Sequence, residues 1–455
     1  MKIKSFNVKM LGALVPVALA FASCSEEKVV VEDPVNPPAD QPSQTVPTDV
    51  VPAQTFTDVT FPKAAFGGTV TSRASRADAG KVLSTVLEVS SPVKGESATS
   101  VFVAEDGTYY VSYQTQGDSV GGGIQTIKGE EVAFYPTEAD DKAFDFNSLY
   151  FDRARVLGVG HYKKTDSKDG AAVVGFLENN GSSIELSYKN VTTAEGIYSE
   201  IIDPENSKGE AHEQLVGYTD AGDANSIVKY YDNYVVATRK GLALLRSDLS
   251  RVREKVGEED SLVYFVNTPG SAKYVVESGN GLTALYLDGT TPCLYDFTSI
   301  VGTTDAKGSK IDGAALVKTN GKNMLAYDNG TIYACLGEAG LLVGNDLLTK
   351  PFKGETKQLP VAGVAVDDDY IYVADGTYLV ILNKADNSVV TKWNLKTDKV
   401  DDEGHAIFEE GSINYVVVGD AQADGTRQLV VACGKAGVKV LSFNPAGSAE
   451  EEEAE

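Results

Sequence analysis

The chain is poor in the residues from which most catalytic and metal sites are built. Its 455 residues include three histidines, four cysteines and one tryptophan. The histidines lie far apart in the sequence and no Gly-x-Ser-x-Gly elbow occurs, so a nucleophile–histidine hydrolase is not indicated. The three cysteines after residue 24 form no C-x-x-C pair, so neither a zinc ribbon nor a disulfide framework is predicted. The sequence therefore assigns no catalytic residue.

Positive charge is also scarce. Lys and Arg number 40 against 65 Asp and Glu, which gives a formal net charge of -25. Binding to nucleic acid needs clustered basic side chains that neutralise phosphates, so this class of partner is excluded. Part of the acidic excess is confined to residues 447–455, which we predict to be a disordered acidic tail.

The N-terminal apolar stretch is too short for a membrane span. It runs from Leu11 to Phe21, whereas a spanning helix needs about 20 apolar residues. It follows a cationic start with three lysines and ends in two small residues just before Cys24. This order is typical of a secretory signal, so residues 1–23 are predicted to be a signal peptide that is removed.

Residues 21–24, Phe-Ala-Ser-Cys, resemble the lipobox of the bacterial lipoprotein family. This resemblance implies that Cys24 is acylated and that the mature chain is anchored to a membrane rather than spanning it. Ser-Glu-Glu-Lys at 25–28 resembles the surface-export signal of lipoproteins from the Bacteroides group, with simple solvation of the new N-terminus as the alternative. The implied location is the outer membrane, at the cell surface or on the periplasmic face.

The segment that follows Cys24 is rich in proline. Residues 24–54 carry repeated prolines separated by Asp, Gln and Thr, with no apolar periodicity. Such a composition favours an extended chain. We predict a flexible tether that holds the body of the protein away from the membrane.

Residues 55–446 lack the 3.6-residue period of amphipathic helices. Short runs rich in Val, Ile, Tyr and Leu alternate with Gly, Asp and Asn turns, which predicts an all-β body. The clearest unit, residues 361–394, contains four strands, and similar units recur at spacings of roughly 40 to 60 residues, the range typical of a β-propeller. We count seven four-stranded blades, with six or eight as alternatives. The last unit has three strands, and the run Val82–Ser90 is predicted to complete it and close the ring.

Two units carry a family resemblance. Residues 370–382, YIYVADGTYLVIL, and 429–441, LVVACGKAGVKVL, resemble the LVIVD-type repeats of bacterial secreted propeller lipoproteins. The resemblance implies the fold and an envelope lipoprotein, but it transfers no activity. Within the repeats, a glycine is predicted to turn the chain between the second and third strands at Gly241, Gly281, Gly340 and Gly437. Cys335 and Cys433 end second strands in different blades, so no disulfide between them is expected.

The densest titratable cluster lies in the loop that leads into the last unit. Asp401, Asp402 and His405, with neighbouring glutamates, offer oxygen ligands and one imidazole that could hold Ca²⁺ or a transition metal. A solvated acidic loop is the more ordinary interpretation, and no other cofactor is predicted. Ser119 and Ser261 lie in Asp-Ser-Val and Asp-Ser-Leu, which resemble the O-glycosylation sequon of Bacteroides-group envelope proteins.

These observations favour binding over reaction. The predicted function is a non-enzymatic binding or scaffold module of the cell envelope, which meets a protein partner or a glycan through the loop face of the propeller. The alternative is a propeller enzyme, a hydrolase or lyase acting on polysaccharide, whose carboxylates would come from different blades to the mouth of the central channel. A purely structural envelope component is the third possibility, and it predicts no concave pocket.

Overall fold

The computed structural model describes residues 64–447 with several gaps. The gaps are residues 65, 73–81, 116–120, 137–141, 153–154, 165–169, 180–183, 191–223, 239–240, 247–252, 257–258, 263–270, 280, 298–306, 312–322, 350–359, 377, 401–405 and 409–410. The regular elements of the described residues are all β-strands, which confirms the all-β prediction. No helix in this part of the chain is long and apolar enough to span a membrane.

Five antiparallel sheets have four strands each, and within each sheet the strands follow their order in the chain. The alternation of apolar runs with Gly, Asp and Asn turns produces this meander, because each tight turn returns the chain beside the strand it has just left. The strands are β3 (Ser97–Val103), β4 (Tyr109–Gln114), β5 (Gly122–Lys128), β6 (Glu131–Pro136); β7 (Lys142–Asp152), β8 (Arg155–Lys164), β9 (Gly170–Asn179), β10 (Ile184–Asn190); β16 (Ser271–Ser278), β17 (Gly281–Asp288), β18 (Thr291–Phe297), β19 (Lys307–Lys310); β20 (Leu325–Asp328), β21 (Thr331–Cys335), β22 (Leu341–Val343), β23 (Asp346–Leu348); and β24 (Val361–Val366), β25 (Tyr370–Asp375), β26 (Tyr378–Asn383), β27 (Val389–Asn394).

A sixth sheet joins the two ends of the body. Its order is β1-β2-β32-β31-β30, so a strand from the start of the chain pairs with one from its end. Leu83 lies opposite Phe443 and Val89 opposite Val438, which confirms the predicted closure by the run Val82–Ser90. The strands are β1 (Val70–Ser72), β2 (Leu83–Val89), β30 (Tyr415–Val418), β31 (Arg427–Ala432) and β32 (Val438–Phe443).

The remaining strands form one three-stranded sheet and two hairpins. The sheet comprises β11 (Ala224–Tyr230), β12 (Asn233–Thr238) and β13 (Gly241–Arg246). The hairpins pair β14 (Arg253–Val256) with β15 (Glu259–Leu262) and β28 (Lys396–Val400) with β29 (Ala406–Phe408).

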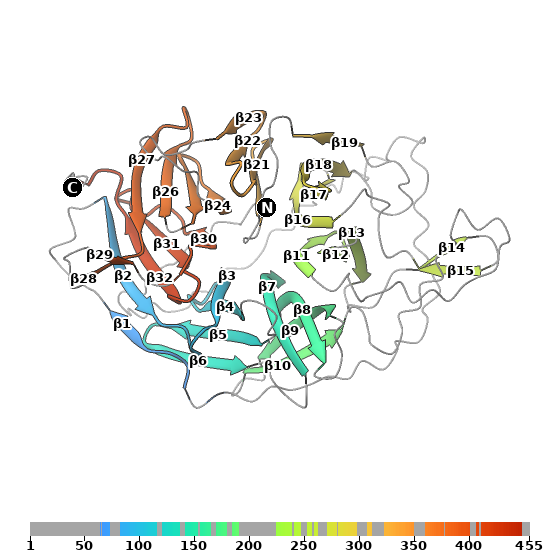
Figure 1. Ribbon diagram of the computed structural model, residues 1–455, viewed down its shortest axis with the longest axis horizontal. Coiled ribbons are helices and arrows are strands. Elements are labelled where there is room, and N and C mark those ends of the chain that lie inside the picture. The colour runs from blue at the N-terminus through green and yellow to red at the C-terminus, as the bar shows by residue number, and fades with distance from the viewer. Residues whose placement is uncertain are drawn as a thin grey trace, which may run out of the picture.

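The innermost strands of the sheets follow one another around a ring (Figure 1). Contacts run from β3 to β7, β11, β16, β20, β24 and β30 and back to β3. The protein is therefore a β-propeller, and among the residues that the structure describes six of its blades have four or five strands. The prediction of seven four-stranded blades is wrong. The β11–β13 unit has three paired strands among the described residues, because β14 and β15 pair with each other instead of adding a fourth strand to β13.

Side-chain hydrogen bonds join neighbouring innermost strands. In β3, β7 and β11 a β-bulge sets one polar residue against the next sheet, where it donates to a backbone carbonyl; the bulge lies near the start of β3 and β11 and in the middle of β7. Asn414, just before β30, makes the same bond across the junction of the last and first sheets. The bonds are Thr99 Oγ1 to Phe146 O (2.7 Å), Asn147 Nδ2 to Ala224 O (3.0 Å), Asn225 Nδ2 to Ala272 O (2.7 Å) and Asn414 Nδ2 to Ala98 O (2.7 Å). The bond from Asn225 joins the starts of β11 and β16, and the bond from Asn414 joins the starts of β30 and β3, so the strands of each of these pairs run in the same direction.

The propeller thus has two distinct faces. The innermost strands end at the hairpin face, which carries the turns between first and second strands and between third and fourth strands, such as Asp367–Asp369. The connections between sheets and the turns between second and third strands lie on the opposite, linker face.

Gly241, Gly340 and Gly437 are placed as predicted before third strands and have positive φ angles. Gly281 instead opens β17, a second strand, because β16 is the innermost strand of its sheet.

Apolar side chains fill the spaces between sheets. The largest buried cluster draws on five of the sheets and includes Val101, Tyr274, Val364 and Tyr415, while separate clusters pack around the β7–β10 and β11–β13 sheets. Cys293, Cys335 and Cys433 are buried, and none of the three forms a disulfide, in agreement with the expectation for Cys335 and Cys433.

Candidate functional site

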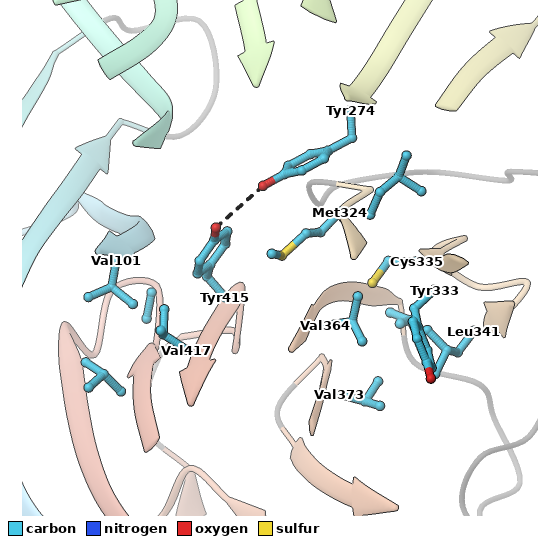
Figure 2. Close-up of a cluster of buried hydrophobic side chains, with 14 of the residues drawn as sticks. Val101, Tyr274, Met324, Tyr333, Cys335, Leu341, Val364, Val373, Tyr415 and Val417 are labelled. Carbon is cyan, nitrogen blue, oxygen red and sulfur yellow. Dashed lines mark hydrogen bonds between the residues drawn. The ribbon is translucent and has the colours of Figure 1, made fainter. Parts of the chain in front are cut away.

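Two tyrosines meet at the axis of the ring. Tyr274 projects from β16 and Tyr415 from β30, and the two side chains point toward each other across the centre in Figure 2. Their hydroxyl oxygens are 3.5 Å apart, within hydrogen-bond distance. Each strand belongs to a different, non-adjacent sheet, so the contact bridges the ring instead of joining neighbours.

A third hydroxyl belongs to this axial cluster. Ser148, on β7 and 2% exposed, hydrogen-bonds to Tyr274. Burial, followed by the neighbouring Tyr415, raises the pKa of Tyr274 well above its ordinary value, and burial also raises the pKa of Tyr415. Both phenols therefore stay neutral at physiological pH, and they close the axis as hydrogen-bonded packing groups instead of exchanging protons.

The hydroxyl of Tyr274 should contribute measurably to stability. We expect Tyr274→Phe to lower the free energy of unfolding by about 1–2 kcal/mol, because Ser148 and Tyr415 would both lose a buried partner. Tyr415→Phe should cost less, since the 3.5 Å contact is long. Urea unfolding at pH 7 measures both. Equal losses for the two variants would show that the Tyr274–Ser148 bond contributes nothing.

A buried carboxylate lies on the linker side of the first two blades. Asp145 on β7 is 9% exposed, and its Oδ1 accepts the backbone N–H groups of Thr115 (2.8 Å) and Gly121 (3.0 Å). Burial raises its pKa although these hydrogen bonds oppose the shift. His161 lies opposite it on β8. These hydrogen bonds make Asp145 a structural residue, because they tie Thr115, after β4, and Gly121, before β5, to the second blade.

The hairpin face contains a charged network that joins two blades. Asp367, between β24 and β25, accepts the backbone N–H groups of Asp369 (2.8 Å) and Tyr370 (2.7 Å) on Oδ1. Its Oδ2 accepts the Tyr372 hydroxyl (2.8 Å) and Arg427 Nε (2.6 Å). Arg427 starts β31 in the next blade, is 5% exposed, and also binds Asp369 and lies over the Tyr370 ring. Asp367 is thus a hub between the β24–β27 and closing blades.

Other cations of the hairpin-face turns are also paired. Lys128 binds Asp106 (2.7 Å) and Lys384 binds Asp328 (2.7 Å). Carboxylates without such a cation stand on neighbouring turns, which gives this face its acidic character. They include Glu130, Asp232, Asp346, Asp368, Asp386, Asp420 and Asp424.

Most sequence-predicted site residues lie outside the described residues. These are Cys24, Ser119, Asp401, Asp402 and His405. Ser261 lies on β15 opposite Glu254, in a hairpin that stands apart from the ring in Figure 1. In the part of the chain that the structure describes, no three His, Cys, Asp or Glu side chains gather as a metal site would require.

The sequence pattern did not identify the axial cluster or the Asp367 hub. The sequence places Tyr274 in a strand, but a strand pattern does not show which tyrosines reach the axis. One signal was present: Tyr274 and Ser148 each follow a bulge residue, and Tyr415 follows Asn414. If the repeats are aligned on the bulge residue, Ser148, Tyr274 and Tyr415 occupy the same position in their innermost strands, and they are therefore expected at the same height along the axis of the ring.

Comparison with known proteins places the chain in no family. No family model matches it, and no curated protein is similar to it in sequence. Among solved structures it is similar to the Pan2 WD40 domain of Neurospora crassa, with 12% identity and a TM-score of 0.41 over 83% of this chain and 94% of that one. At this level of similarity the comparison assigns neither a family nor an activity to the chain.

Proposed function

We propose that this protein is a lipid-anchored module of the cell envelope that binds a protein partner or a glycan through a face of its propeller, without catalysis. The observation that carries the proposal is the axial cluster. Because Tyr274, Tyr415 and Ser148 meet there, the axis at that level is filled by neutral hydroxyls, and the two faces remain as the surfaces for recognition.

The rigidity of the ring supports the same function. Side-chain bonds from Thr99, Asn147, Asn225 and Asn414 join one innermost strand to the next, and β2 closes the last blade. A rigid ring that displays short turns suits binding, because little conformational entropy is lost when the turns meet a partner. The LVIVD-type resemblance and the Pro-rich tether agree with a lipoprotein displayed away from an outer membrane.

Anchoring is tested at Cys24. In cells that express the full-length chain, we expect the protein to incorporate an alkyne-tagged fatty acid and to sediment with membranes, whereas Cys24→Ala should lose the label and most of the membrane fraction. Protease treatment of intact cells then separates surface display from the periplasmic face. An unlabelled wild-type chain in the soluble fraction would contradict the anchor.

Binding is tested by cross-linking the tagged lipoprotein in intact cells. Capture of a protein or glycan in constant ratio to the lipoprotein is expected. Two results together would contradict the non-enzymatic proposal and favour the enzyme alternative. The first is that the lipoprotein captures neighbouring proteins only in proportion to their abundance, and the second is that the purified chain hydrolyses or cleaves a polysaccharide.

A further inference from the structure

One aromatic side chain on the hairpin face is exposed to solvent. Tyr231, in the two-residue turn between β11 and β12, is 76% exposed. Its φ angle is +52°, in the left-handed region that a bulky residue adopts only under strain. The innermost strand β11 ends at Tyr230, so Tyr231 lies where the hairpin face borders the central axis.

Other described turns on this face fill left-handed positions with small residues. Gly107, Gly129 and Gly344 have positive φ angles, and Asn329–Gly330 forms the turn between β20 and β21. Glycine and asparagine adopt this conformation at little cost. The turn at Tyr231 would therefore be more stable with a small residue, and the exposed ring is not explained by the needs of the hairpin.

The orientation of the ring is fixed by its neighbour. Tyr230 is 8% exposed, and its ring meets that of Tyr231 edge to face with centroids 4.6 Å apart and planes at 73°. Burial raises the pKa of Tyr230, and Tyr231 and then Glu277 add to the shift. Glu277 is exposed near the end of β16, the innermost strand that packs beside β11. An exposed aromatic face and two phenolic hydroxyls thus lie together at the end of β11, and a carboxylate lies near the end of the strand packed beside it.

We propose that Tyr231, supported by Tyr230 and Glu277, forms a stacking platform for a neutral carbohydrate. This inference rests on the proposed binding function and names the class of ligand. A pyranose ring presents an apolar C–H face to an aromatic ring, and its hydroxyls both donate and accept hydrogen bonds. The carboxylate of Glu277 accepts from such hydroxyls, and the phenols donate to them.

A cationic ligand matches this place less well. An ammonium or guanidinium group would stack on Tyr231 and pair with Glu277, but it has no acceptor for a phenolic donor. A polyol uses both the donors and the acceptor.

The test is binding of neutral oligosaccharides to the purified full chain. A glycan array of gluco-, manno-, galacto- and xylo-oligosaccharides is screened first, and hits are titrated by calorimetry with wild type, Tyr231→Gly, Tyr231→Phe and Glu277→Gln. Tyr231→Gly should weaken binding by about tenfold or more while the thermal midpoint stays level or rises, since strain is released. Tyr231→Phe should stay within about threefold of wild type, and Glu277→Gln should fall between the two. Asn329→Gly, on the hairpin-face turn between β20 and β21, is the matched control and should bind like wild type.

Two results would overturn the inference. One is the absence of any hit at millimolar oligosaccharide, and the other is a hit whose affinity Tyr231→Gly leaves unchanged. If envelope cross-linking still captured a protein partner in constant ratio, the proposed binding function would stand while the carbohydrate platform was rejected. Tighter binding of a lysine- or arginine-rich peptide than of every sugar, lost in Tyr231→Gly, would likewise reject it in favour of a cationic ligand.

Discussion

Gly437→Ala is expected to lower the free energy of unfolding by about 3–5 kcal/mol. Gly437 precedes β32, with a φ of +78°. A Cβ atom there would meet backbone atoms at the end of β2 and just after it, namely Val89 O, Ser91 N and Ser90 C. The backbone cannot rotate away as a flexible side chain does. The methyl group would therefore push β2 apart from β32, the pair of strands that closes the ring. Urea unfolding followed by far-UV circular dichroism measures the loss.

The matched control is Gly107→Ala. Gly107 has nearly the same φ, +80°, but a Cβ atom there would have nothing within 4 Å. Backbone strain alone should cost about 1 kcal/mol at that turn. If the two variants lost equal stability, crowding between β2 and β32 would be irrelevant and the loss would be due to the left-handed backbone alone.

The fold was largely predictable because each blade carries its own local signal. Strand runs separated by Gly and Asp turns identify a meander, and recurrence identifies a propeller. The run Val82–Ser90 was recognisable as the closing strand because the last unit lacked a fourth. The blade count failed at residues 253–262, where two short runs pair with each other as β14 and β15. Strand propensity indicates which residues form a strand, but it does not indicate which of the neighbouring strands in space each one pairs with.

The candidate sites were less predictable because they combine residues from distant units. The Tyr274–Tyr415 contact spans 141 residues of sequence and depends on the curvature of the whole ring. Tyr231 lies in a turn whose strain appears only in its φ angle. By contrast, the predicted lipidation of Cys24, which stays a prediction, needs only a signal and a processing site that are contiguous in the chain.

The second large effect is expected at the Asp367 hub. Asp367→Ala removes the acceptor of two backbone N–H groups, the Tyr372 hydroxyl and Arg427 Nε. Arg427 is 5% exposed, so its guanidinium would lose a partner in a place where water reaches it poorly. Breaking a buried ion pair by removing one member typically costs about 3–5 kcal/mol, and we expect a loss of about 3–4 kcal/mol in urea unfolding.

A control substitution on a similar turn distinguishes the contribution of Asp367 to the contact between blades from its contribution to its own turn. Asp386 accepts the backbone N–H (3.0 Å) and hydroxyl (2.6 Å) of Ser388, but it is exposed and binds no other blade. Asp386→Ala should therefore cost far less than Asp367→Ala. A double-mutant cycle with Arg427→Met isolates the pair itself, and a coupling above about 1 kcal/mol is expected for contacting charged groups. Additive losses in that cycle would mean that Asp367 acts only on its own turn, and that the closing blade is held to its neighbour by apolar packing such as that between Tyr370 and Phe443.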